Sequence, residues 1–280
     1  MGDFRPWPPQ LRPGRALAHT PGASGFGSPH RSDSRPPQTP RGGRRSGQLG
    51  RPGTTPPVPG RPTSFLPLLG LLGLPALLFA LITWQVVADG PLAGVDRRVS
   101  HALVDPLRVY GALADLGDVF VAVPVLAVVI GHVARRGRAA GTYRWWLPPL
   151  AAAVAMALVP VLVVPLKALI DRPGPPIMGP GTGYYPSGHT ATATVAYGAA
   201  TLLLLPRLSR ARVRRALVAA CVAVDLGVGY GLVRRGYHWP LDVVASWCLC
   251  AVLLTGLWMF LGRSSRRTSA APPGSSSGPG

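Results

Sequence analysis

The 280-residue chain has few acidic residues and almost no lysine. It contains no glutamate. Lys167 is its only lysine, and the other 28 of its 29 basic residues are arginine. The formal net charge is +19, yet 48% of the residues are apolar. This combination is unusual for one soluble domain unless the charge and the apolar residues occupy different segments, and in this chain they do.

Cysteine is also scarce, and its placement argues against a metal site. Cys221, Cys248 and Cys250 all lie in apolar segments, where a thiol behaves as a small apolar side chain. Cys248 and Cys250 lack the two-residue gap and the histidine partners of a zinc site. We therefore expect neither a metal nor a cofactor.

The two ends of the chain are polar. Residues 1–63 hold ten arginines against two aspartates and are dense in Pro, Gly and Ser. Such a segment cannot bury enough apolar surface to offset its chain entropy, so it is predicted to be a disordered cytoplasmic tail. A solvated tail is favoured, and the alternative is binding to anionic lipid headgroups or to nucleic acid, of which the nucleic-acid partner is not expected. Residues 263–280 are predicted to form a second disordered cytoplasmic tail.

The region between the tails, residues 64–262, contains six apolar segments close to the ~20 residues that a bilayer core requires. The predicted fold class is therefore all-α, a six-span transmembrane helical bundle. The predicted spans lie at about 64–88, 117–134, 145–168, 188–206, 214–233 and 240–262.

The arginines between the spans predict the orientation. The loops 135–144 and 207–215 hold four and five arginines and no acid, which places them and both termini in the cytoplasm by the positive-inside rule. The loop 89–116 has more aspartates than arginines and is predicted to lie outside. Segments 169–187 and 234–239 then share the outer face of a multi-pass plasma-membrane protein.

These two outer segments contain, or directly adjoin, the polar groups that phosphate chemistry needs. Splitting a phosphoester requires cations around the nonbridging oxygens, an in-line nucleophile, and an acid for the leaving oxygen. The candidates are Lys167, Arg172, Ser187, Gly188, His189, His238 and Asp242.

His238 and Asp242 are four residues apart at the start of the last predicted span, so their side chains can meet. A carboxylate on one imidazole nitrogen fixes the tautomer and makes the other nitrogen a better nucleophile. We assign His238 as the nucleophile and Asp242 as its orienting partner. The alternative is an interfacial histidine bonded to a helix-start aspartate for structural reasons.

His189 opens the fourth predicted span. Ser187 and Gly188 place a hydroxyl and approachable backbone amides at this helix start, where an anion is favoured. His189 can then give a proton to the leaving oxygen. The alternative is a helix cap with an incidental histidine.

Lys167 ends the third predicted span. As an alternative to binding phosphate, it can act as a snorkelling anchor. However, the chain uses arginine for every other basic position, and Lys167 lies on the side predicted to be poor in cations. Arg172 adds a planar fork suited to phosphate oxygens.

The segments 167–175, 186–189 and 238–242 resemble the three signature motifs of the type 2 phosphatidic acid phosphatase family, in order, spacing and span layout. The resemblance extends over roughly residues 64–262. It implies a phosphohistidine on His238, protonation of the leaving group by His189, and no metal. It also implies phosphate contacts from Lys167, Ser187 and Gly188.

Two arginines of the family pattern are absent from this chain. The first motif expects Arg-Pro where Gly174–Pro175 stand, and the third motif begins with Ser-Arg where Gly231–Leu232 stand. We expect Arg172 and one of Arg234 or Arg235 to bind phosphate in their place.

Two matters stay open at the level of sequence. Asp225, within the fifth predicted span, is either functional or neutral and hydrogen-bonded to a neighbouring helix. The substrate is predicted to be a lipid phosphate or a polyprenyl diphosphate such as undecaprenyl diphosphate, with neither preferred. The alternative function is a catalytically weak or inactive protein that binds or transports lipid phosphates on the same scaffold.

Overall fold

The computed structural model describes residues 65–269 except residue 106, and all regular structure in this part of the chain is helical. The all-α prediction is therefore confirmed. The predicted tail at 1–63 lies outside the described residues. The helices are α1 (Phe65–Val87), α2 (Pro91–Leu103), α3 (Arg108–Asp115), α4 (Val119–Ala139), α5 (Leu147–Ile170), α6 (Gly188–Leu204), α7 (Ala211–Arg234) and α8 (Pro240–Ser269), with short 3₁₀ turns at Pro176–Met178 and Leu205–Arg207.

Five of these helices, α1, α4, α5, α7 and α8, are long and apolar enough to cross a membrane. Large apolar side chains such as Leu69, Val128 and Val161 are exposed on them. Exposed apolar surface of this extent is costly in water but suits the hydrocarbon region of a bilayer. The described chain thus has the features of a multi-pass membrane protein.

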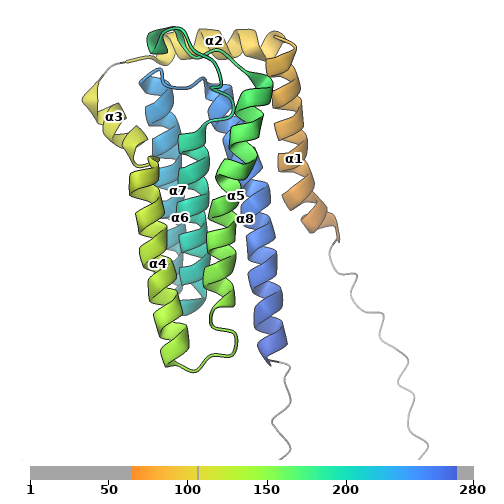
Figure 1. Ribbon diagram of the computed structural model, residues 1–280, viewed down its shortest axis with the longest axis vertical. Coiled ribbons are helices and arrows are strands. Elements are labelled where there is room, and N and C mark those ends of the chain that lie inside the picture. The colour runs from red at the N-terminus through yellow and green to blue at the C-terminus, as the bar shows by residue number, and fades with distance from the viewer. Residues whose placement is uncertain (1–64, 106, 270–280) are drawn as a thin grey trace, which may run out of the picture. The chain divides into compact units, whose positions relative to one another are not determined.

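The fourth predicted span, 188–206, forms α6, which has 17 residues. This helix packs against α4, α5, α7 and α8, so it lies in the centre of the bundle (Figure 1). Its buried face is rich in small residues, and a Cβ atom at Gly198 would come within 2.5 Å of Leu254 Cδ1. Small residues at such positions let neighbouring helices approach closely.

The segment 89–116, expected as a loop, instead forms the short helices α2 and α3. Helix α2 is amphipathic, since Ala93, Asp96 and Ser100 are buried while Arg97 and Arg98 are exposed. A helix this short and polar gives no hydropathy signal of a span. It lies across one end of the bundle, against α1, α7 and α8 (Figure 1).

The end of the bundle beneath α2 gathers several helix termini. The carboxyl ends of α5 and α7 and the amino ends of α6 and α8 all lie there (Figure 1). The opposite end carries the short connections from α4 to α5 and from α6 to α7. Helix α8 runs to Ser269, beyond the predicted end of the last span at 262, and residues 270–280 lie outside the described residues.

Candidate active site

The turn between α7 and α8 places His238 at the end of the bundle that lies beneath α2. Gly236 adopts a φ of 68°, and the amides of Gly236 and Tyr237 donate to Val233 O and Leu232 O, both at 2.9 Å. This glycine-dependent cap ends α7 and reverses the chain. Pro240 then begins α8, a position where its missing N–H costs nothing.

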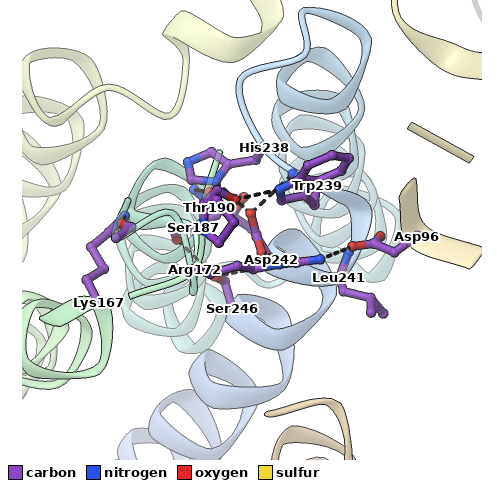
Figure 2. Close-up of polar contacts among 12 residues, drawn as sticks. Asp96, Lys167, Arg172, Ser187, Thr190, His238, Trp239, Leu241, Asp242 and Ser246 are labelled. Atoms are coloured by element: carbon purple, nitrogen blue, oxygen red, sulfur yellow. Dashed lines mark hydrogen bonds and ion pairs between the residues drawn. The ribbon is translucent and has the colours of Figure 1, made fainter. Parts of the chain in front are cut away.

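His238 and Asp242 meet as the sequence spacing predicts (Figure 2). Nδ1 of His238 lies 3.2 Å from Oδ2 of Asp242, which also accepts the Trp239 amide at 3.1 Å. Asp242 is fully buried, and the His238 side chain is 8% exposed. Because a carboxylate accepts but does not donate, Nδ1 carries the proton and Nε2 is left with its lone pair.

Arg172 binds the other oxygen of Asp242. Its Nη1 donates to Asp242 Oδ1 at 2.5 Å, and its Nη2 donates to Asp96 Oδ2 at 2.7 Å (Figure 2). The residue is 7% exposed, and its guanidinium lies over the Trp239 ring. The expectation that Arg172 binds phosphate does not fit this geometry, because two carboxylates already hold both terminal nitrogens.

Ser187 connects the starts of α6 and α8. Its side-chain oxygen accepts hydrogen bonds from Thr190 N at 3.3 Å and Thr190 Oγ1 at 3.0 Å, so it caps α6. Its backbone amide donates to Asp242 O at 3.2 Å, and Ser246 Oγ donates to Ser187 O at 2.9 Å. Ser187 is fully buried, and its hydroxyl serves the helix cap rather than the phosphate contact expected from the sequence.

One cavity of about 1090 Å³ is lined by both histidines, His189 and His238. Lys167, Gly188 and Tyr184 also line it. Lys167 Nζ donates one hydrogen bond, to Gly183 O at 2.7 Å, and an ammonium has two further N–H groups to offer. The structure thus brings a cation, a helix amino terminus and two imidazoles from three distant segments to one space.

The loop between α5 and α6 is anchored to α1. Tyr185 is fully buried, and its hydroxyl lies 2.7 Å from Thr83 Oγ1 on α1. Burial raises the pKa of the Tyr185 phenol, so it stays protonated. This contact, with the stacking of Tyr185 on Phe79, fixes the loop that carries Arg172 and leads into His189.

His189 has a more open setting than His238. Its side chain is 47% exposed, and its Nε2 lies 3.7 Å from Oδ2 of Asp118. Asp118 caps α4 by accepting the Phe120 amide at 2.8 Å, and it lines the same cavity. Sequence reasoning missed Asp118, because an aspartate at a helix start signals only a cap.

Arg234 and Arg235 lie outside the cavity lining. Arg234 donates to Asp105 Oδ2 at 2.5 Å, and its guanidinium lies over the rings of Tyr110 and Tyr230. Arg235 donates to the Tyr237 hydroxyl at 3.2 Å. Among the described lysines and arginines, only Lys167 lines the cavity.

Asp225 of α7 has a partner on a neighbouring helix. Thr194 Oγ1 of α6 donates to Asp225 Oδ1 at 2.7 Å. This contact corresponds to one of the two interpretations left open by the sequence, a carboxyl group hydrogen-bonded within the bundle.

Comparison with known proteins finds a family model that matches part of the chain. Residues 148–266 match the family model of the PAP2 superfamily. This segment of the chain is similar to the PAP2 superfamily. The matched PAP2 segment includes Lys167, His189, His238 and Asp242, whereas Asp96 and Asp118 precede it.

One solved structure shows the same fold. The chain is similar to the crystal structure of the first transmembrane PAP2 type phosphatidylglycerolphosphate phosphatase from Bacillus subtilis, with a TM-score of 0.54 and 23% sequence identity. The likeness covers 69% of this chain and 96% of that chain. Among curated proteins, the sequence finds no match.

Proposed function

We propose that this chain is a PAP2-type membrane phosphohydrolase that removes phosphate from a lipid phosphate or a polyprenyl diphosphate. One observation carries the proposal. The His238–Asp242 pair and His189 come from different helix starts and line or directly support one cavity that also contains Lys167. A nucleophile, its orienting carboxylate, an acid and a cation are the groups that phosphoryl transfer needs.

In the first half-reaction, Nε2 of His238 attacks phosphorus, and the bond from phosphorus to the ester oxygen breaks. His189 gives its proton to that oxygen, so the lipid leaves as an alcohol, or as a monophosphate when the substrate is a diphosphate. Lys167 and the amides at the start of α6 stabilise the charge on the nonbridging oxygens. The proton on Nδ1 remains hydrogen-bonded to Asp242.

In the second half-reaction, water attacks the phosphohistidine. The phosphorus–nitrogen bond breaks, His238 recovers its lone pair, and His189 takes the proton from water. Inorganic phosphate then leaves. The cycle balances without a metal ion or any second reactant besides water.

The shape of the cavity supports a lipid substrate. Beyond the histidines, it is lined by apolar residues of α4 and α5. These are Val119, Val123, Leu126, Ala127 and Ile130 on α4, and Ala153, Met156, Ala157, Val159, Pro160, Val163 and Val164 on α5. From Lys167 back to Ala153 the lining extends ~20 Å at 1.5 Å per residue. That is longer than the ~15 Å of half a bilayer core, so an acyl or prenyl chain fits it.

We further propose that α6 is the sixth span and that the site faces outward, in the plasma membrane. The 17 residues of α6 reach ~26 Å, which is close to the thickness of the hydrocarbon core, and the surrounding helices shield the polar groups of α6. The arginine-rich connections lie at the opposite end of the bundle from the histidines, as the positive-inside rule requires of an outward site.

A phosphate-release assay tests the activity. Membranes containing the chain should release phosphate from phosphatidate or undecaprenyl diphosphate, and far more slowly from the water-soluble glycerol phosphate. His238→Ala should abolish release. Equal traces of release from both proteins would contradict the enzymatic proposal.

The cavity itself can be tested with Ala157→Trp, which fills the apolar lining far from the histidines. We expect a higher KM for long-chain substrates and an unchanged rate with a short-chain analogue. A matched variant, Val128→Trp, places the same side chain on α4 at a position that does not line the cavity and is 72% exposed.

A second candidate is a catalytically weak or inactive protein that binds or transports lipid phosphates. The cavity favours it in one respect, since Lys167 is the only lining cation among the described lysines and arginines. Each missing charge-assisted contact to phosphate weakens transition-state binding by about 1.5–3 kcal/mol. Saturable binding of phosphatidate without release, equal in the wild type and His238→Ala, would support this candidate.

A further inference from the structure

A line of buried polar side chains links α2 to the His238 imidazole (Figure 2). Asp96 Oδ2 accepts from Arg172 Nη2 at 2.7 Å, Arg172 Nη1 donates to Asp242 Oδ1 at 2.5 Å, and Asp242 Oδ2 lies 3.2 Å from His238 Nδ1. Asp96 is 3% exposed. It lies 76 residues before Arg172 and outside the segment that matches the family.

Asp96 also fixes the first turn of α8. Its second oxygen, Oδ1, accepts the Leu241 amide at 2.8 Å. Leu241 directly precedes Asp242, so one carboxylate holds both the backbone that carries Asp242 and the guanidinium that binds it. A helix start holds amides without an intrahelical partner, and a buried carboxylate is a strong acceptor for one of them.

The formal charges in this cluster are informative. Arg172 and Asp242 alone form a neutral pair, whereas Asp96, Arg172 and Asp242 together carry −1. The cluster is shielded from solvent, so its charge is weakly screened at the adjacent imidazole. A nucleophilic histidine gains positive charge as it bonds to phosphorus, and a fixed −1 beside it balances that charge.

We propose that Asp96 is a positioning residue for the nucleophile, which acts through Arg172 to hold Asp242 on His238 and supplies the negative charge that balances the phosphohistidine. The catalytic part of this proposal rests on the proposed phosphohydrolase function. Arg172 therefore serves the orienting carboxylate and does not replace a phosphate-binding arginine.

Other charged groups also face His238. These groups are Asp242 at the start of α8, Lys167 of α5, His189 of α6 and Asp118 at the start of α4. Substituting Asp96 alone leaves the chemical identity of all these groups unchanged. A change in pH dependence after that substitution therefore reports on the charge of Asp96.

The first variant is Asp96→Asn, which keeps an oxygen for the Leu241 amide and removes the charge. We expect kcat to fall by about 10- to 100-fold with KM within about twofold, since the substrate contacts are intact. The acidic limb of the kcat/KM profile should move to lower pH, because losing a nearby negative charge makes an imidazole easier to deprotonate. If the acidic limb of the kcat/KM profile does not move and the variant only yields less folded protein, the proposal is overturned.

The second test is a double-mutant cycle, read as the thermal unfolding temperature in detergent. Arg172→Gln alone leaves Asp96 and Asp242 without the cation between them, so the unfolding temperature should drop strongly. Adding Asp96→Asn removes the excess charge and should recover much of that loss without restoring kcat. Additive effects of the two substitutions would show no coupling and contradict the proposal.

Arg172→Lys provides the conservative rescue. It keeps the charge but loses the fork that reaches two carboxylates at once, so its kcat should fall between those of the wild type and Arg172→Gln. A kcat of Arg172→Lys no higher than that of Arg172→Gln would contradict the proposed link from Asp96 to Asp242 through the cation of Arg172.

Asp89→Asn is the matched control. Asp89 pairs with Arg97 at 2.6 Å on the exposed surface, near Asp96 in sequence. We expect its kcat, pH profile and unfolding temperature to match the wild type. If the wild type itself releases no phosphate, the proposed function fails, while the unfolding cycle still decides whether Asp96, Arg172 and Asp242 act as one unit.

Discussion

The two histidines of the site have contrasting surroundings. His238 is almost completely buried, its Nδ1 is held by Asp242, and the Tyr184 ring packs edge-on against it. His189 is half-exposed, and its nearest carboxylate, that of Asp118, lies 3.7 Å away. The start of α8 is a buried, hydrogen-bonded polar network, whereas the start of α6 presents its histidine to an open cavity.

This difference matches two chemical tasks. A nucleophile must present one lone pair along one line, so a fixed tautomer and ring orientation lower the cost of reaching the transition state. A group that acts first as an acid and then as a base meets the leaving oxygen in the first half-reaction and a water molecule in the second. A less constrained imidazole can serve both.

Removing the fixed histidine should have the largest effect. His238→Ala eliminates the proposed nucleophile, and we expect kcat to fall by at least about 10⁴-fold, because the proposed covalent intermediate cannot form. His132→Ala, on α4 and outside the cavity lining, is the control and should keep full activity. Release of phosphate by His238→Ala at more than a hundredth of the wild-type rate would argue against the assignment.

Removing the open histidine should cost less and depend on the substrate. His189→Ala should lower kcat for a lipid phosphate by about 10²- to 10⁴-fold, the usual contribution of general acid catalysis. With an aryl phosphate, whose leaving group needs little protonation, the loss in the first step should be much smaller. Equal losses in kcat/KM, which reports on the first half-reaction, with both substrates would remove His189 from the role of acid.

The carboxylate near His189 should have the smallest effect. Asp118→Asn keeps a capping oxygen for α4, so only the charge facing His189 changes. We expect kcat to fall by a few-fold, since a partly exposed pair at 3.7 Å interacts weakly. Asp171→Asn, at an exposed position after α5, should leave the rate unchanged. A loss as large as that of His189→Ala would show that the open site is as tightly organised as the buried one.

Local sequence patterns predict only part of the contrast between the surroundings of His238 and those of His189. Five of the six predicted spans and the His238–Asp242 contact could be predicted, because hydropathy and a spacing of four residues depend on neighbouring positions only. The predicted orientation of the spans and the family resemblance together predict one shared site. Its members are Lys167, Gly188, His189 and His238. The cavity lining agrees with that placement.

The partners of the arginines could not be predicted in this way. Arg172 carries the planar fork that suits phosphate, but the same fork suits two carboxylates, and the second of these lies on α2. Helix α2 was itself expected as a loop, so the sequence placed Asp96 only among the acids of an outer segment. Arg234 likewise pairs with Asp105, 129 residues away in sequence. Such contacts become visible only when the helices are placed in space.

Detection of the covalent intermediate would show whether His238 is the nucleophile. His189→Ala should accumulate it, because the variant still forms the phosphorus–nitrogen bond with an activated aryl phosphate but lacks the base for its hydrolysis. After a rapid quench at alkaline pH, mass spectrometry should find one phosphate, labile to acid, on the peptide that contains His238. The same label on another residue, or none at any time during turnover of an active preparation, would contradict the account.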